Sequence, residues 1–254
     1  MASQAEAYQE ARRPARMVVA IVVLLLGVTG VGVCATGVAL QVLPRRFTAE
    51  QQQAIKNWEV AARWRQFTAG DIFRASVTYQ PTSLLGDGGA GSVTLTAQRL
   101  GIAAQASCAA ALDPGIAADL DRGGCQSVLR ATYADATDSY VVTVGVAVLP
   151  STTRARAAAV ALGVAAGLRT AQFPGTPSAQ FTDSRRQLMA SFSAGPYVVL
   201  YAVGYSGDRP AVPVSGDQYV TAEMTSMASG VAHSVANTLD ATPAVPRCPG
   251  APGC

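Results

Sequence analysis

The chain has 254 residues, of which half are apolar and only 14% are charged, against about a quarter in typical soluble domains. Its formal net charge of +3 comes from arginines near the N-terminus, because residues 47–254 carry fourteen basic and fourteen acidic side chains. A region without net charge has no broad positive field to attract phosphates. The composition therefore argues against nucleic-acid binding.

Residues 17–43 form an uncharged stretch, MVVAIVVLLLGVTGVGVCATGVALQVL, which is long enough to cross a bilayer as a helix. Three arginines lie just before it and two just after it. The positive-inside rule therefore predicts a single-pass membrane protein with a short cytoplasmic tail, residues 1–16, and with the rest of the chain extracellular.

A cleaved signal peptide and a lipoprotein anchored at Cys34 are the alternatives. The apolar stretch is longer than the signal-peptide core of about 7–15 residues, and a valine stands directly before Cys34, where a lipobox has a small residue. All three readings place the C-terminal part of the chain outside the cytoplasm.

The four cysteines beyond the apolar stretch support that location independently. They are Cys108, Cys125, Cys248 and Cys254, and an even number is typical of disulfide-bonded proteins in oxidising compartments. Four cysteines allow three pairings. The simplest joins Cys108 to Cys125 and Cys248 to Cys254; four free thiols are the alternative.

A capping-box pattern at Thr48 and Gln51, followed by apolar residues at helical spacing, predicts a helix after the membrane segment. This helix either packs on the outer domain or rests at the lipid headgroups through its tryptophans. Alternating residues then predict strands at 72–79 and 93–100. Between them, the glycine-rich loop 84–92 lacks the Gly-Lys-Ser/Thr of a phosphate-binding loop.

The clearest pattern is a strand–turn–strand–helix unit that occurs twice, after short helical turns over 107–122 that Pro114 interrupts. The expected segments are strands at 126–134 and 140–149 with a helix from Ser151 to about residue 168, then strands at 186–193 and 197–206 with a helix at 217–239. In the last helix, apolar residues from Val220 to Leu239 form one stripe, which is typical of a core-facing surface.

The expected fold class is α+β, an N-terminal transmembrane helix followed by an antiparallel sheet that carries helices from two successive ββα units on one side. The corresponding boundaries are a cytoplasmic tail at 1–16, the transmembrane helix at 17–43, a juxtamembrane helix and linker at 44–70, the extracytoplasmic domain at 71–240 and a Pro- and Cys-containing tail at 241–254.

No group of residues indicates catalysis, a cofactor or a metal. His233, the only histidine, falls on the polar face of the last helix, with no nucleophile nearby in sequence. The pairs Asp119/Asp121 and Asp135/Asp138 fall at a helix end and in a turn, where aspartate commonly bonds its own backbone, and calcium requires more oxygen ligands. We therefore predict no enzyme activity, no cofactor and no metal site.

Tyr140, Tyr197, Tyr201 and Tyr205 share one face of the strands at 140–149 and 197–206. Both strands are apolar on both faces, as central strands covered on two sides are. If the helices cover the opposite, small-residue face, the tyrosine face is either covered by the early segments or exposed. In the exposed case the four tyrosines form a concave interaction face for a ligand or partner.

The segment WRQFTAGDIF, the pair Cys108 and Cys125, and the segments VLRATYAD and VTVGVAVLP resemble uncharacterised single-pass membrane proteins of actinobacteria. A looser similarity is to the extracellular sensor domains of mycobacterial serine/threonine kinases, although the expected cytoplasmic tail is too short for a kinase.

We therefore expect a membrane-anchored extracytoplasmic binding or protein-interaction module of the cell envelope. Its expected partner is an envelope protein or a small ligand. We expect no nucleic acid as a partner. The alternatives are a structural accessory subunit of a membrane complex and an envelope hydrolase.

Overall fold

The computed structural model describes residues 47–81, 93–162, 167–212 and 218–242. Its elements, in chain order, are α3 (Ala49–Gln66), α4 (Ala69–Ile72), β1 (Ser76–Tyr79), β2 (Leu95–Ala106), α5 (Cys108–Ala111), α6 (Pro114–Arg122), β3 (Ser127–Asp135), β4 (Tyr140–Val148), α7 (Thr152–Leu162), η1 (Asp183–Arg185), β5 (Leu188–Ala194), β6 (Tyr197–Tyr205) and α8 (Gln218–Asp240). None of the helices in these ranges is long and apolar enough to cross a membrane. The predicted membrane segment, Cys34, Cys248 and Cys254 lie outside the described residues.

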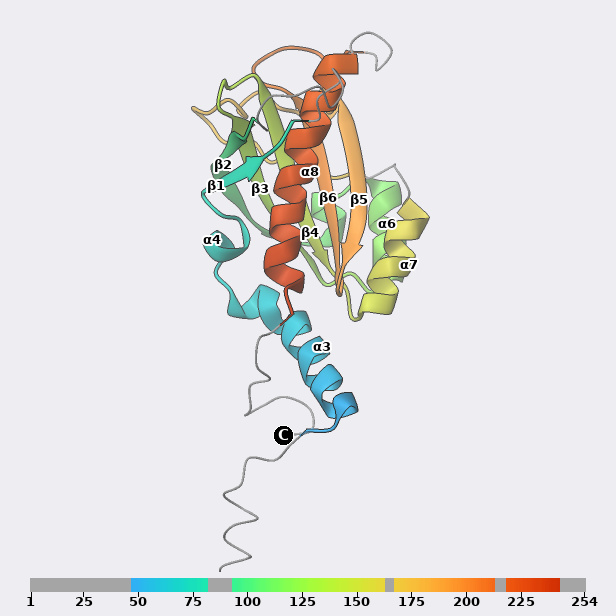
Figure 1. Cartoon of the computed structure of the whole chain (residues 1–254). Coiled ribbons are helices and arrows are strands. Elements are labelled where there is room, and N and C mark those ends of the chain that lie inside the picture. Colours follow the sequence, from blue (N-terminus) through green and yellow to red (C-terminus); the bar gives the residue numbers. More distant parts are fainter. Residues whose placement is uncertain (1–46, 82–92, 163–166, 213–217, 243–254) are drawn as a thin grey trace, which may run out of the picture. The chain divides into compact units, whose positions relative to one another are not determined.

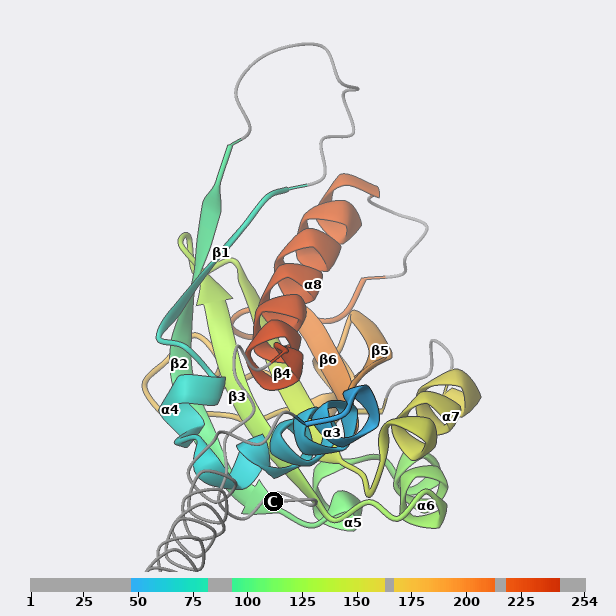
Figure 2. The ribbon, with the colours of Figure 1, turned by 60° about the horizontal axis from the view of Figure 1, so that its bottom comes forward.

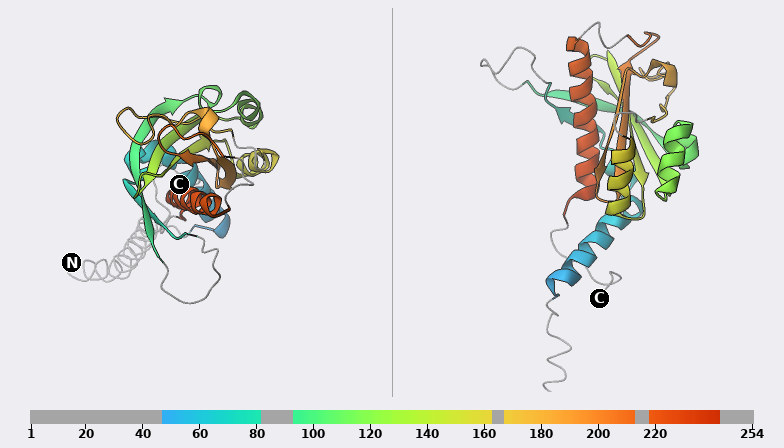
Figure 3. Two further views of the ribbon diagram at one scale, coloured as in Figure 1. Left: turned by 90° about the horizontal axis from the view of Figure 1, so that it is seen from above. Right: turned by 90° about the vertical axis from the view of Figure 1, so that its right-hand side faces the viewer.

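The six strands form one antiparallel sheet in the order β1-β2-β3-β4-β6-β5. The register of β2 against β3 shifts between Arg99 and Gly101 and again between Ala103 and Ala106. Such bulges bend a strand and increase its twist. The sheet accordingly curls around α8 (Figure 3), which confirms the expected α+β class with an antiparallel sheet.

Helices cover both faces of this sheet (Figures 1 and 3). The apolar stripe of α8, which includes Met227 and Val231, is buried against the valine and tyrosine side chains of β4 and β6. On the opposite face, α5, α6 and α7 pack on the small-residue side, for example around Ala147 and Leu200. The expectation that the helices lie on one side was wrong, because both faces of the central strands are apolar and each requires a cover.

The predicted pairing of Cys108 with Cys125 is confirmed. The disulfide joins α5 to the turn before β3, with Cα atoms 6.4 Å apart. The interrupted helix predicted over 107–122 is also present, and Pro114 begins α6, where its missing N–H is harmless. By contrast, the strand predicted from residue 72 begins only at Ser76, after the short, capped helix α4.

Residues 167–187, between α7 and β5, form an irregular strap across the sheet rather than the end of a helix. Leu168 and Phe173 each lie over a strand glycine, and a Cβ atom at Gly145 or Gly101 would come within 2.5 Å of them. Polar contacts fix the strap further: the Arg186 guanidinium pairs with Asp113 at 2.9 Å. We refer to residues 167–187 as the strap. Figure 2 shows the same ribbon with α3 and the short helices in front.

Candidate functional site

The four tyrosines do not form a free surface. Tyr140, Tyr197 and Tyr201 are 9%, 0% and 8% exposed, and Tyr205 is half-buried. They lie in the core between the sheet and α8, so α8 fills the concave surface that the alternation pattern left open. These tyrosines therefore belong to the core and do not form an interaction face. We do not propose them as a site.

The Tyr197 hydroxyl has a structural role in this core. The Tyr197 hydroxyl donates a hydrogen bond to the Val60 carbonyl at 2.5 Å and so joins β6 to α3. Burial raises the pKa of Tyr197 to about 12. A tyrosine with so high a pKa is a poor nucleophile at neutral pH.

The remaining candidate residues also have structural roles. Asp135 accepts hydrogen bonds from the backbone N–H groups of Thr137 and Tyr140, at 3.0 and 2.6 Å, and thus shapes the β3–β4 turn as predicted. His233 is exposed on α8, with its ring centroid 4.5 Å from that of Phe192. Asp135 thus shapes a turn, and the ring contact of His233 is with an aromatic side chain.

One group of potential metal ligands occurs among the described residues, formed by Cys108, Asp121 and Cys125. Because the two sulfur atoms are joined in the disulfide, neither is a thiolate, and the thiolate is the form that binds metals. The group therefore does not fit a metal ion in this oxidised state.

A large hollow lies between β1 and the polar face of α8. Its volume is about 630 Å³, within the range of about 300–1,000 Å³ that is common for ligand clefts. We call it the edge groove; its lining consists of Phe67, Arg74, Ser76, Val77, Thr78, Gly230, His233, Ser234, Asn237, Thr238 and Ala241. Seven of these eleven residues have polar side chains, so the groove is suited to hydrogen bonding.

One wall of the edge groove is the open edge of the sheet, because β1 is a terminal strand. The Arg99 N–H donates to the Ala75 carbonyl at 2.9 Å, so Ala75 faces β2, and by alternation Val77 does too. The backbone N–H and C=O groups of Ser76 and Thr78 therefore point away from the sheet. Within the described residues, these outward groups have no hydrogen-bond partner.

The start of β1 is held firmly in place. The Tyr133 hydroxyl donates to the Arg74 carbonyl at 3.0 Å, and the Arg99 guanidinium donates to the Phe73 carbonyl. These bonds occupy backbone carbonyls and leave the exposed Arg74 side chain at the end of the groove. Arg74 is the only side chain with a permanent charge among the groove residues, so the groove favours a partner with a negative charge at that end.

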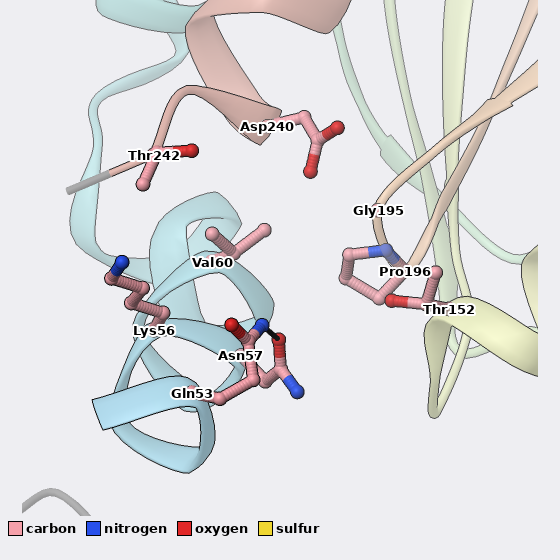
Figure 4. Close-up of a pocket in the computed structure, with 9 residues that line it drawn as sticks. All are labelled: Gln53, Lys56, Asn57, Val60, Thr152, Gly195, Pro196, Asp240 and Thr242. Carbon is pink, nitrogen blue, oxygen red and sulfur yellow. Dashed lines mark hydrogen bonds between the residues drawn. The ribbon is translucent and has the colours of Figure 1, made fainter. Parts of the chain in front are cut away.

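A second, smaller cavity of about 220 Å³ lies where α3, the β5–β6 turn, the start of α7 and the end of α8 meet. We call it the basal pocket; its lining residues are Gln53, Lys56, Asn57, Val60, Thr152, Gly195, Pro196, Asp240 and Thr242. Figure 4 shows Lys56 and Asp240 on opposite sides of Val60. Unlike the edge groove, this pocket therefore carries both signs of charge.

Neither cavity was predicted from the sequence. Ser76 and Thr78 alternate with the buried Val77 and Tyr79, so the alternation was visible, but nothing local shows that β1 ends the sheet. Lys56 and Asp240 lie at nearly opposite ends of the described chain. Only the tertiary fold brings such residues together.

Comparison of the chain with protein-family models, with curated proteins and with solved structures finds no match.

Proposed function

We propose that this chain is a membrane-anchored extracytoplasmic protein-interaction module of the cell envelope, and that it binds an extended segment of a partner protein as an additional strand beside β1. The observation that carries the proposal is the edge groove, which places a polar cleft directly against backbone groups of Ser76 and Thr78 that have no partner among the described residues. Strand addition of this kind derives its affinity from main-chain hydrogen bonds.

The groove also supplies the contacts that such a segment requires for specificity. Alternate side chains of an added strand would point toward α8, where His233, Ser234 and Asn237 offer hydrogen-bonding groups. The Arg74 side chain favours an acidic residue at one end of the segment. We therefore infer a polar, extended partner segment that carries a carboxylate.

The anchor and the location are supported by the sequence. The uncharged stretch 17–43 precedes the folded domain, and the Cys108–Cys125 disulfide is of the kind that persists in oxidising compartments. The resemblance to single-pass membrane proteins of actinobacteria points in the same direction. With a short cytoplasmic tail, the module acts by holding a partner at the outer face of the membrane.

Photo-cross-linking from the groove tests this function. A photoreactive amino acid at Asn237, which is exposed and lines the groove, is introduced into the full chain in intact cells. We expect a discrete protein adduct that the substitution Thr78→Pro reduces by at least about tenfold, because proline removes the outward donor and obstructs strand addition. Proline is tolerated at such an edge position because the lost N–H does not belong to the ladder.

Thr78→Ala is the matched control, since it removes the side chain but keeps the backbone N–H. It is expected to retain the adduct, and both variants are expected to keep the thermal midpoint of the domain. Equal adduct yields from Thr78→Pro and Thr78→Ala in folded protein would exclude strand addition. The absence of any adduct from Asn237, when a photoreactive residue at the exposed Ala104 of β2 gives one, would move the interaction surface elsewhere.

A further inference from the structure

The basal pocket has walls from separate elements that are fastened to one another. The buried Tyr197 hydroxyl donates to the Val60 carbonyl at 2.5 Å and joins β6 to α3. The buried Arg63 guanidinium donates to the Leu239 carbonyl at 2.9 Å and joins α3 to the end of α8. Both bonds lie at or next to residues of the pocket lining. The pocket is therefore preorganised, which lowers the entropic cost of binding a ligand.

The β5–β6 turn completes the pocket, and the turn depends on a glycine. Gly195 has φ +54°, in the region that favours glycine. A Cβ atom at this position would lie 2.5 Å from Asp240 Oδ1 and 3.1 Å from Val60 Cγ1. The absent side chain thus allows the Asp240 carboxylate to stand close beside the turn, facing the cavity (Figure 4).

Two opposite charges line this pocket without neutralising each other. Lys56, the only lysine of the chain, comes from α3, and Asp240 comes from the end of α8. Within the described residues, neither side chain takes part in an ion pair. Each charge is carried by a separate, fastened element, so the pocket presents one positive and one negative side chain rather than a closed salt bridge.

We propose that the basal pocket binds a small zwitterion, either a free amino acid or a very short peptide, with its carboxylate beside Lys56 and its ammonium group beside Asp240. A simple anion would find Asp240 repulsive and a simple cation would find Lys56 repulsive. A ligand with both charges satisfies both walls. The volume of about 220 Å³ limits the ligand to this size class, and Asn57 and Thr242 add hydrogen-bonding groups.

Isothermal titration calorimetry of the full chain in detergent tests the proposal with L-alanine and L-alanyl-L-alanine as probes. The two probes separate their charges by different spans. At least one is expected to bind with a Kd tighter than about 10 mM, which is a modest affinity because both side chains are partly solvated. Amidating the carboxylate or acetylating the amine of that probe is expected to weaken binding by about fivefold or more.

Variants of the chain assign each charge to its partner by double-mutant logic. In Lys56→Met, amidation of the probe is expected to have no further effect, whereas acetylation still weakens binding. In Asp240→Asn the pattern is reversed. Lys56→Arg retains the cation and is expected to keep the discrimination against the amidated probe, and Asp208→Asn, a substitution of an exposed carboxylate outside the pocket, is expected to behave as the wild type.

The outcomes separate cleanly. Absence of saturable binding of both probes to the wild-type chain overturns the proposal, and so does binding that Lys56→Met and Asp240→Asn leave unchanged. The variants are expected to keep the unfolding midpoint of the wild type, because neither charge loses an ion pair with another described residue. The edge groove contains neither residue, so the result is independent of partner binding there.

Discussion

At the scale of single residues, the buried tyrosines make the stability of the domain sensitive to alkaline pH. Burial raises the pKa of Tyr79, Tyr140 and Tyr197 from 10.0 to about 12. In the unfolded chain these phenols ionise at their ordinary pKa, so the unfolded state releases protons first as the pH rises. The stabilisation is therefore complete below about pH 10 and is lost as the pH approaches about 12.

We predict that the urea midpoint of the full chain in detergent is level between about pH 8 and 9 and falls steadily above about pH 10. Tyr197→Phe is expected to be less stable at pH 8 by about 1 kcal/mol, since the hydrogen bond to Val60 is lost. It is also expected to lose less stability between about pH 10 and 12, because one ionising group is gone. A urea midpoint of the wild-type chain that stays unchanged above about pH 10 would contradict the raised pKa values of these tyrosines.

At the scale of elements, the strap packs on glycines of the sheet, and this packing can be tested by compensation. A Cβ atom at Gly145 would lie 2.5 Å from Leu168 Cδ1, so Gly145→Ala overpacks the core and is expected to cost about 1–3 kcal/mol. Leu168→Ala, which truncates a fully buried side chain, is expected to cost about 2–5 kcal/mol.

The double variant Gly145→Ala/Leu168→Ala is expected to be more stable than the sum of the single effects predicts, by about 0.5–3 kcal/mol, because the new methyl group occupies part of the vacated space. Urea unfolding of the four proteins gives this coupling energy directly. Gly175→Ala is not a suitable control because its φ of +75° is itself strained for alanine. Gly115→Ala is a better one, as nothing lies within 4 Å of the added atom. Strict additivity would show that the strap does not pack as described.

The elements that could be predicted from the sequence are those with local signals. The two β-hairpins and the helices after them follow from alternation, turn residues and helical spacing, and α6 begins at Pro114 as its sequence indicates. The side of the sheet that each helix covers has no local signal, because β4 is apolar on both faces. The strap was missed for a similar reason: its anchors Leu168 and Phe173 are matched to glycines on distant strands, and no periodicity marks such a match.

The candidate sites were less predictable than the fold. The tyrosine pattern correctly marked a large apolar face, but a face of that kind is as useful to a core helix as to a partner, and α8 covers it. The edge groove depends on β1 being the last strand of the sheet, and the basal pocket depends on the meeting of four elements. Both are properties of tertiary structure.

At the scale of the whole molecule, the remaining prediction concerns which side of the membrane each part occupies. The arginines flanking residues 17–43 favour a cytoplasmic N-terminus only narrowly, whereas the Cys108–Cys125 disulfide requires an oxidising environment to persist. The two signals agree, and together they predict that residue 3 is inside and the sheet domain outside. Single reporter cysteines can test both positions in one protein background.

In a background in which Cys34, Cys248 and Cys254 are replaced by serine, a membrane-impermeant maleimide is expected to label Ala104→Cys, at an exposed position of β2, in intact cells. Ser3→Cys is expected to react only after the membrane is permeabilised. The disulfide cysteines stay unreactive in both proteins because they are paired, so they serve as an internal check on the oxidising compartment. Labelling of Ser3→Cys in intact cells while Ala104→Cys stays protected would invert the topology. It would also remove the edge groove from the cell envelope, and with it the proposed role.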